Sequence, residues 1–482
     1  MRRVVLGPFN RVEGDLEVSL EIDRGRIVAA RVNSPLFRGF EQILLGKHPL
    51  DALVYAPRVC GICSVSQSVA AAGALRDAIG LVVPRNGELA TNLLLASENV
   101  ADHLTHFYLF FMPDFARDGY ADRPWHAALG PRFKAFAGSA CRDMLPARAG
   151  LLQIMGLLGG KWPHTLSVQP GGVTRAVHPG EKQRLFALLR DFRGWLERYL
   201  YGDALEAVVA LDSDGALRRW CSGGAPAAAD IGAFLELADD LALAEAGRAS
   251  DRFLSYGSYP VDGTAGYRSG VWGGELLALD QADVAEDCSH AWLHAPARAL
   301  HPWQGLTEPD VDRDGAYSWC KAPRWRGRVV ECGALARQVV DGHPLARALV
   351  AQGGGNVRSR VIGRLLEIAR SVIAMECWAR AIEPGAPFCT QGALPQEARG
   401  VGLVEAARGA LGHWLVLRKG RIANYQIVAP TTWNFSPRDA AGTPGALEQA
   451  LCDLQEEDCA RRELMVQHIV RSFDPCMVCT VH

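Results

Sequence analysis

Two cysteine pairs lie near opposite ends of the chain, and each has the C-x-x-C spacing that can bring two thiolates onto one metal. The first pair is Cys60 and Cys63, and the second is Cys476 and Cys479. Spacing alone favours structural zinc, because tetrahedral zinc held by four cysteines is the commonest use of paired C-x-x-C motifs in an intracellular chain. The sequence therefore predicts a four-thiolate metal site, with zinc as its simplest occupant.

Three features of the flanking sequence argue against a simple zinc knuckle. Such knuckles are small local modules, whereas these pairs are separated by almost the whole chain. Charged residues stand beside both pairs, with Arg58 before the first and Asp474 before the second. His482 follows the last cysteine by three residues, which brings an imidazole close to the same metal. These features favour a reactive metal centre that needs the whole fold to assemble.

The two motifs together resemble those of the large subunit of nickel-iron hydrogenases, which carries R-x-C-G-x-C early and D-P-C-x-x-C-x-x-H at its mature end. The resemblance covers the full length of the chain. Ordered matches of this kind are far more specific than a single C-x-x-C. The further matching segments are residues 11–14, 38–41, 102–108, 407–414 and 424–434.

This resemblance implies a nickel-iron centre. Cys60 and Cys476 would bind nickel terminally, while Cys63 and Cys479 would bridge nickel to an iron that carries carbon monoxide and cyanide. Heterolytic cleavage of dihydrogen gives a hydride and a proton, so it needs a soft metal and a nearby base. The expected enzyme is a hydrogenase that converts H2 into protons and electrons.

The resemblance also assigns roles to residues beside the cysteines. Glu13 would relay a proton from Cys476, although its spacing fits a solvated carboxylate at a hairpin edge equally well. Arg408 and the turn at Pro430 and Thr431 would surround the diatomic ligands, where the guanidinium and the threonine hydroxyl would donate hydrogen bonds to cyanide. The alternative for the arginine is a surface ion pair, but its Gly/Ala-rich segment permits close backbone approach.

A second, hard-cation site is implied close to the cysteines. Glu41, His482 and a backbone oxygen near Ile427 would bind Mg2+ or a similar ion, which prefers oxygen ligands. Asp102 and Asp474 match acidic residues near the bimetallic centre, where they would form buried ion pairs or handle protons.

Three departures from the family pattern point to a subgroup. Gln67 stands where most catalytic members have histidine. Ile62 and Phe110 are larger than the valine and leucine common along the family's gas path, and Ala407, just before Arg408, stands where proline is frequent. These choices resemble the regulatory, hydrogen-sensing enzymes, which signal through the small subunit to a histidine kinase. An energy-conserving uptake hydrogenase is the alternative within the family, and a zinc-stapled structural subunit is the alternative outside it.

Composition limits the partners and the location. The net charge of −2 does not indicate the excess of basic residues that is typical of nucleic-acid-binding proteins. No apolar stretch reaches the roughly 18 to 20 residues that span a bilayer, and the first residues do not form a signal peptide, so a cytoplasmic location is expected. No second cysteine cluster has iron-sulfur spacing. Electrons must therefore leave through a partner, and the resemblance implies an iron-sulfur small subunit that forms a heterodimer with this chain.

The elements that must position these residues follow from hydrophobic periodicity. A chain of 482 residues with 49% hydrophobic content can bury a large core. The expected fold is mainly α with peripheral β (α+β), and the resemblance adds a long central helical bundle. We predict one body over 1–482, with a β-rich segment at 1–50, a mainly helical core at 51–400 and a metal-binding end at 401–482. One helix is predicted to begin near residue 65, and three more are predicted over 89–111, 183–200 and 360–382. Hairpins are predicted over 16–32 and 414–428.

Overall fold

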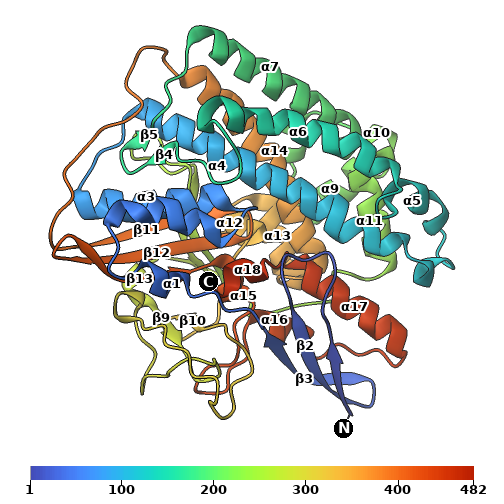
Figure 1. The fold of residues 1–482 in the computed structure, drawn as a ribbon. Coiled ribbons are helices and arrows are strands. Elements are labelled where there is room, and N and C mark those ends of the chain that lie inside the picture. Colours follow the sequence, from blue (N-terminus) through green and yellow to red (C-terminus); the bar gives the residue numbers. More distant parts are fainter. Residues whose placement is uncertain (1) are drawn as a thin grey trace.

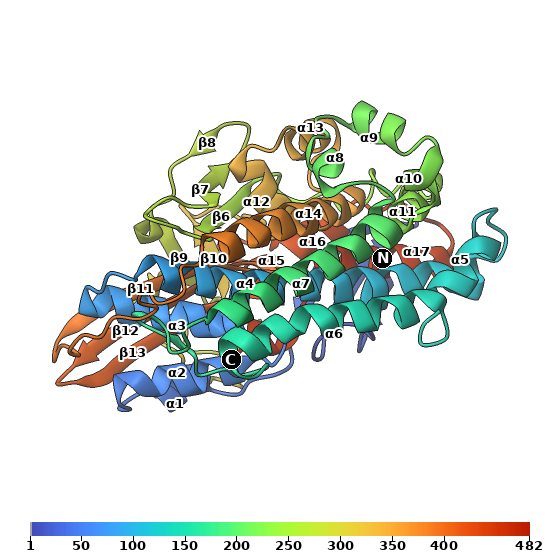
Figure 2. The same cartoon turned by 90° about the horizontal axis from the view of Figure 1, so that it is seen from above.

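Four long helices pack together in the upper part of the molecule as seen in Figure 1. The computed structural model describes residues 2–482, of which 47% are helical and 18% lie in strands, so the predicted mainly helical α+β fold is confirmed. Each of these helices contacts two of the others, so that the four contacts close a ring. Figure 2 shows the helices running alongside one another. They are α4 (Arg85–Thr105), α6 (Ser139–Gly159), α7 (Pro179–Trp195) and α14 (Val357–Ala381).

Two of these helices continue into π-helical turns that the periodicity does not reveal. α4 is followed by π-helical His106–Phe111, and α7 by π-helical Leu196–Tyr201. Apolar residues continue through both wider turns, so the predicted helices 89–111 and 183–200 each include an α-helical and a π-helical part. π-helical turns of this kind often occur next to functional sites.

The chain opens with an antiparallel sheet in the order β1 (Arg2–Leu6), β2 (Glu17–Asp23) and β3 (Arg26–Asn33). The turn between β2 and β3 places Arg24 and Gly25 at positive φ, which is the conformation a tight hairpin needs. The hairpin predicted over 16–32 is therefore present. The loop between β1 and β2 carries Glu13.

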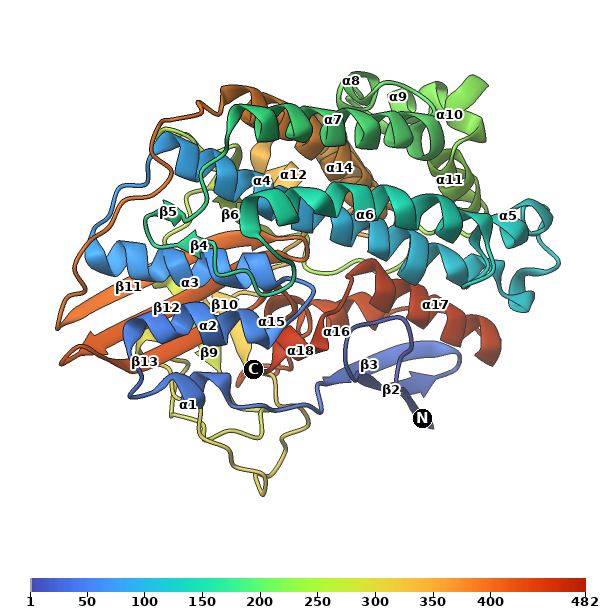
Figure 3. The same cartoon turned by 45° about the horizontal axis from the view of Figure 1, so that its top comes forward.

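A second antiparallel sheet lies deeper than the expected peripheral strands. It has the order β11 (Ala398–Ala406), β12 (Gly409–Arg418) and β13 (Arg421–Val428), and β12 is buried along all but its last residue. Helix α3 (Ser64–Ile79) lies directly on β11, as Figure 3 shows. The close approach depends on glycine, because a Cβ at Gly402 would lie 1.9 Å from the carbonyl oxygen of Ala70.

The other elements surround these layers. The strands are β4 (Val168–Gln169), β5 (Gly172–Val173), β6 (Phe253–Ser258), β7 (Tyr267–Trp272), β8 (Leu276–Leu277), β9 (Val284–Asp287) and β10 (Ala322–Trp325). The helices are α1 (Phe40–Leu44), α2 (Ala52–Tyr55), α5 (His126–Phe133), α8 (Leu205–Val209), α9 (Asp214–Trp220), α10 (Gly224–Ala228), α11 (Asp230–Asp240), α12 (Ala334–Asp341), α13 (Pro344–Gly353), α15 (Pro430–Asn434), α16 (Ala446–Leu451), α17 (Cys459–Ser472) and α18 (Met477–Thr480).

The C-terminal segment is inserted into the molecule. The N–H of Met477 donates to the carbonyl oxygen of Glu13 at 2.7 Å, and Glu13 pairs with Cys476 in a parallel bridge. His482 is only 5% exposed. One hydrophobic cluster includes residues from Leu16 to Cys479, so both ends of the chain share a core. Among residues 2–482, no helix has the length and apolar character needed to cross a bilayer.

Candidate metal centre

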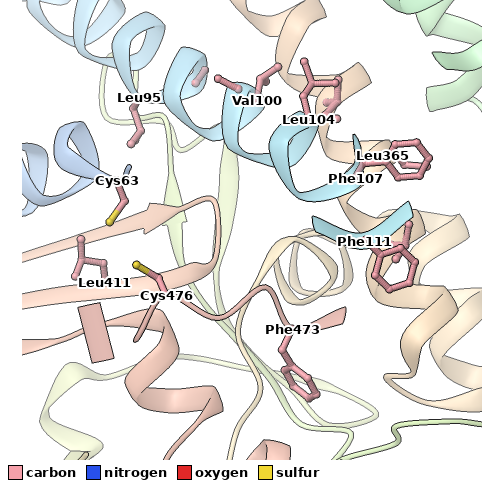
Figure 4. Packing of buried hydrophobic residues seen from close by; sticks show 14 of the residues in the cluster. Cys63, Leu95, Val100, Leu104, Phe107, Phe111, Leu365, Leu411, Phe473 and Cys476 are labelled. Carbon is pink, nitrogen blue, oxygen red and sulfur yellow. The ribbon is translucent and has the colours of Figure 1, made fainter. Parts of the chain in front are cut away.

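The four cysteines of the two C-x-x-C motifs converge in one buried cluster. The Sγ–Sγ distances are 3.5 Å for Cys60 and Cys476, 3.2 Å for Cys63 and Cys479, and 3.0 Å for Cys476 and Cys479. All four sulfur atoms lie within 4.8 Å of one another, and none forms a disulfide. Figure 4 shows the sulfurs of Cys63 and Cys476 directed towards each other. Such a set of thiolates fits one or two soft transition metals.

Local structure at the first motif holds its sulfurs in this arrangement. Cys63 immediately precedes α3, and the Sγ of Cys60 accepts hydrogen bonds from the N–H groups of Ile62 at 3.3 Å and Cys63 at 3.5 Å. N–H donors and a helix N-terminus both stabilise negative charge on sulfur. Hydrogen bonds with the neighbouring cysteines lower the pKa of Cys60 well below its ordinary value, whereas hydrogen bonds with the same cluster and burial raise the pKa of Cys63. The C-x-x-C spacing therefore sets the geometry and favours the thiolate form at Cys60.

Arg408 lies between two carboxylates beside the cysteines. Its guanidinium contacts Asp102 Oδ2 at 2.5 Å and Asp474 Oδ1 at 3.1 Å, and its Nε donates to the carbonyl oxygen of Asp474 at 2.9 Å. Arg408 is only 3% exposed, which excludes the surface ion pair. The structure thus brings the three predicted residues together.

The two aspartates of this cluster differ in proton affinity. Burial raises the pKa of Asp102 to about 7, although the charge of Arg408 opposes the shift. Burial also disfavours the charged form of Asp474, but Arg408 and other nearby cations lower its pKa overall. Oδ1 of Asp102 and Oδ2 of Asp474 are buried without a hydrogen-bond partner. These two carboxylate oxygens can therefore each accept a hydrogen bond from a further group near the thiolates.

Of the two residues predicted in this turn, Thr431 supports the second cysteine motif, whereas Pro430 contacts Cys332, which lies outside both motifs. The Oγ1 of Thr431 accepts a hydrogen bond from the N–H of Cys476 at 3.1 Å, and the carbonyl oxygen of Pro430 accepts one from Cys332 Sγ at 3.3 Å. The hydroxyl hydrogen of Thr431 stays available for a ligand. That this turn contacts cyanide remains a prediction.

Glu13 lies at the same site and is half-buried. Burial and the neighbouring Cys60 raise the pKa of its carboxyl, while the charges of Arg408 and Arg38 lower it less. Glu13 is partly open to solvent, and its backbone pairs with that of Cys476. A carboxyl in this position with a raised pKa suits a proton relay. The hairpin-edge alternative does not explain this placement.

Gln67 lies one helical turn after Cys63 and is fully buried. Its Oε1 lies 2.8 Å from Nε2 of His413, and the hydroxyl of Tyr425 lies 2.8 Å from Nδ1 of the same ring. Burial lowers the pKa of His413 to about 3, so the imidazole is neutral. Gln67 therefore fixes one tautomer, in which Nε2 carries the hydrogen.

The two residues of the predicted gas path are less enclosed than the thiolates. Ile62 is half-buried inside the first cysteine motif, and Phe110 is half-buried in the π-helical turn after α4. Their role in gas access remains a prediction.

The residues of the predicted hard-cation site also converge. Oε1 of Glu41 lies 3.3 Å from Nε2 of His482 and accepts a hydrogen bond from the N–H of Ile427 at 2.8 Å. Ile427 thus contributes its N–H here, where the sequence predicts a backbone oxygen. The hydroxyl of Thr307 contacts Glu41 closely from the other side.

The same cluster contains two residues that sequence reasoning missed. Nζ of Lys321 lies 3.1 Å from Glu41 Oε2 and 3.6 Å from Glu286 Oε2. Burial would raise the pKa of Glu41, but Lys321 and His482 lower it to about 2. A cavity of about 20 Å³ lies among these residues, and both buried oxygens of Glu286 lack a hydrogen-bond partner. Oε1 of Glu286 has neither a hydrogen-bond partner nor an ion-pair partner, and a free carboxylate oxygen beside a space for one small ion fits a hard cation.

The family of the chain is shown by comparison with known proteins. Residues 38–118 and 117–482 match the family described as nickel-dependent hydrogenase. The chain is 28% identical to the periplasmic [NiFeSe] hydrogenase large subunit of Desulfomicrobium baculatum and 26% identical to the uptake hydrogenase large subunit of Rhodobacter capsulatus. Both alignments cover 100% of this chain and 95% of the relative.

A solved structure agrees with this assignment. The Ni-Fe-Se hydrogenase of D. vulgaris Hildenborough in the reduced state superposes with a TM-score of 0.84 and 26% identity, covering 100% of both chains. The superposed region extends over the whole chain and so includes residues 60–63 and 476–479. The chain therefore belongs to the nickel-dependent hydrogenase family, and it is the large, metal-binding subunit of a hydrogenase.

Proposed function

We propose that this subunit oxidises dihydrogen in an uptake-type hydrogenase, at a nickel-iron centre held by Cys60, Cys63, Cys476 and Cys479. The convergence of four buried thiolates within 4.8 Å carries the proposal. The uptake role is favoured because several of the relatives, including that of Rhodobacter capsulatus, are named uptake hydrogenases. No relative reported above is named a hydrogen sensor.

When bound, the metals would supply the soft site at which H2 is polarised. The chain itself provides a path for the proton and a fixed positive charge. Glu13 accepts the proton at its carboxylate and passes it outwards, because it is half-buried, its backbone pairs with Cys476, and burial and Cys60 raise its pKa. Arg408 presents a guanidinium whose charge is balanced by Asp102 and Asp474.

The remaining parts of the centre are proposed on the same basis. Iron would carry carbon monoxide and cyanide next to Arg408 and Thr431, and Mg2+ would occupy the cavity beside Glu41 and His482. The Mg2+ assignment is supported by Glu286 Oε1, a buried oxygen beside that cavity that has no hydrogen-bond partner. The diatomic ligands are supported by the buried guanidinium of Arg408 and by the nickel-dependent hydrogenase family of the chain. A cytoplasmic location is also part of the proposal.

Electrons would leave through an iron-sulfur small subunit. Within residues 2–482, the four cysteines are the only group found that could hold a metal with three or more His, Cys, Asp or Glu ligands. Gly61, which lies between the first two cysteines, is exposed at the surface. A small subunit that covers the surface at Gly61 would bring its nearest cluster close to the thiolates.

The test is elemental analysis and infrared spectroscopy of the purified heterodimer. We expect nickel and iron in equal amounts, with stretching bands of iron-bound carbon monoxide and cyanide. A sample that contains zinc alone and lacks these bands would instead identify a structural subunit.

Hydrogen sensing is the second candidate, favoured by the pairing of buried Gln67 with His413. In this role, the heterodimer would turn over slowly and signal through the small subunit to a histidine kinase. Kinase autophosphorylation measured with and without H2 separates the two roles. A response of the kinase to H2 supports sensing, whereas fast dye reduction without any kinase response supports uptake.

A further inference from the structure

Glu98 is a buried carboxylate that the proposed reaction does not use. It lies on α4 and is 2% exposed. Its Oε2 accepts hydrogen bonds from the N–H of Val65 at 2.8 Å, from Trp162 Nε1 at 3.0 Å and from Ser64 Oγ at 3.4 Å. Its Oε1 accepts from the N–H of Ser66 at 2.8 Å and from the hydroxyl of that residue at 2.9 Å. Two oxygens thus satisfy five donors.

Three of these donor residues form the first turn of α3. The first N–H groups of a helix have no partner within the helix and need a cap. Cys63, which holds the N-cap position of α3, makes no side-chain cap hydrogen bond. The carboxylate from α4 therefore replaces the missing local cap, and its negative charge also complements the helix dipole.

We propose that Glu98 is the positioning residue of the Cys63 thiolate. Cys63 is covalently joined to Ser64, so the direction of the first turn of α3 determines where its sulfur points. Glu98 binds that turn through both backbone and side-chain groups. It does not touch the sulfur, and it acts by fixing the backbone on which the sulfur is carried.

The position of Glu98 on α4 extends this role to the other side of the centre. Asp102 follows Glu98 by four residues, and residues at this spacing lie on the same face of a helix. Asp102 binds Arg408, while Glu98 binds the turn after Cys63. Through these two contacts, helix α4 fixes the position of the Cys63 thiolate relative to the guanidinium of Arg408.

The chemistry of the five partners explains why a carboxylate is needed. Each partner donates a hydrogen bond, and an ionised carboxylate only accepts. A glutamine at this position would keep one acceptor oxygen and would direct its NH2 group at other donors. Even an isosteric substitution should therefore displace the turn after Cys63.

The inference rests on the proposed four-thiolate metal site, and it is tested by metal binding to the full chain rather than by turnover. The metal-free chain is titrated with Co2+, and thiolate-to-cobalt absorption is recorded. Burial raises the pKa of Glu98 to about 7, so the titration is run at pH 8, where the carboxylate is ionised. Thermal unfolding is recorded for each variant.

Glu98→Gln should weaken Co2+ binding by about 10- to 100-fold and shift the absorption band, which is the usual effect of losing a group that orients a metal ligand. Glu98→Asp, which keeps both acceptor oxygens, should recover part of the affinity. The matched control is Glu88→Gln on the same helix. Glu88 also accepts a backbone hydrogen bond, from Asp262 at 2.8 Å, and is half-buried. The control should leave the affinity unchanged.

Trp162→Phe removes one of the hydrogen bonds to Glu98. It provides a second test of the positioning role if Glu98→Gln does not fold. It should reduce the affinity in the same direction but by less. Native affinity and an unshifted band in the folded variants, at a temperature well below unfolding, would overturn the positioning role while leaving the metal site intact. Absence of Co2+ binding by the native chain would overturn the metal site and the positioning role together.

Discussion

Each of the four cysteines is buried, so changing one sulfur alters the metal site without exposing new surface. Cys479→Ser replaces a soft thiolate by a harder oxygen that binds nickel and iron poorly. We expect loss of nickel and of hydrogen-dependent activity, measured by elemental analysis and hydrogen-deuterium exchange. Cys377→Ser, at an exposed cysteine, is the control and should keep both. Retained nickel with normal exchange in Cys479→Ser would contradict the assignment.

The carboxyl of Glu13 can be tested at the same scale. Glu13→Gln keeps the shape of the side chain but removes its titration, so exchange should fall by about 100-fold or more. Metal content should stay native, because Glu13 is not one of the four cysteine ligands. Asp15→Asn, at an exposed carboxylate two residues later, should have no effect. An unchanged exchange rate in Glu13→Gln would place the relay elsewhere.

Single residues also show how far the sequence predicts the site. Spacing and resemblance predicted the four cysteines, Arg408 and its two aspartates, because each lies in a local motif. Lys321 and Glu286 lie in no motif, and they reach Glu41 only through the tertiary fold. Glu98 offered a weak signal, its helical spacing from Asp102. Its partners in α3 lie more than thirty residues away, so spacing alone could not assign them.

At the scale of elements, the contact between α3 and β11 controls the position of the first cysteine pair. Gly402→Ala would place a methyl group 1.9 Å from the oxygen of Ala70, so the helix must move. We expect a loss of about 1 to 3 kcal/mol in the free energy of unfolding, the usual cost of overpacking, together with weaker metal retention. Denaturant unfolding and metal analysis provide the measurements.

The control for this substitution is Gly156→Ala in α6. A Cβ at Gly156 meets no atom within 4 Å, and alanine is favoured over glycine in a helix by about 0.5 to 1 kcal/mol. Gly156→Ala should therefore be neutral or stabilising. Equal stability of both variants would show that α3 does not depend on the glycine contact.

A buried ion cluster joins α17 to the loop that carries Glu13. Asp114 lies 2.5 Å from Arg471 and also pairs with Arg11, while the guanidinium of Arg471 donates to the carbonyl oxygen of Asn10 at 2.8 Å. Burial would raise the pKa of Asp114, but His468 and the two arginines lower it to about 2. The loop is thus held by a carboxylate that stays ionised at neutral pH.

The lowered pKa of Asp114 makes the free energy of unfolding depend on pH. The ordinary pKa of the group is 3.8, so its stabilising contribution is complete above that value and is lost as the pH falls towards 2. The contribution amounts to about 2 kcal/mol. Asp114→Asn should lower the free energy of unfolding at pH 7 by about 3 to 5 kcal/mol, because it leaves buried arginines without a charged partner. The difference from the native protein should shrink as the pH falls from 4 to 2, and a constant difference would contradict the assignment.

The elements themselves were predicted more completely than their ends. Residues 16–32 and 360–382 are predicted as a hairpin and a helix close to the observed bounds, because the hairpin alternates apolar and polar residues and the helical segment is long and contains no proline. The sequence predicts an ordinary helix through His106–Phe111, which is π-helical, because its apolar residues continue at helical spacing. The burial of β12 was missed because a strand enclosed on both faces shows no alternation.

At the scale of the whole molecule, the metal site links segments that are 416 residues apart. A metal that binds only the folded state stabilises it by mass action, by about 2.7 kcal/mol at a free concentration one hundred times Kd. We expect Co2+ or the native metals to raise the unfolding temperature measured by calorimetry. The double variant Cys60→Ser/Cys476→Ser should abolish the increase, and an equal increase in that variant would place the stabilising metal elsewhere.

The distance along the chain between the ligands also has a consequence for synthesis. At about 5 to 20 residues per second, the ribosome needs about 20 to 80 s to proceed from Cys60 to Cys476. During that interval the first two thiols have no partners from the second motif. The nascent chain must therefore protect a reactive half-site from oxidation and from stray metal until its last segment emerges.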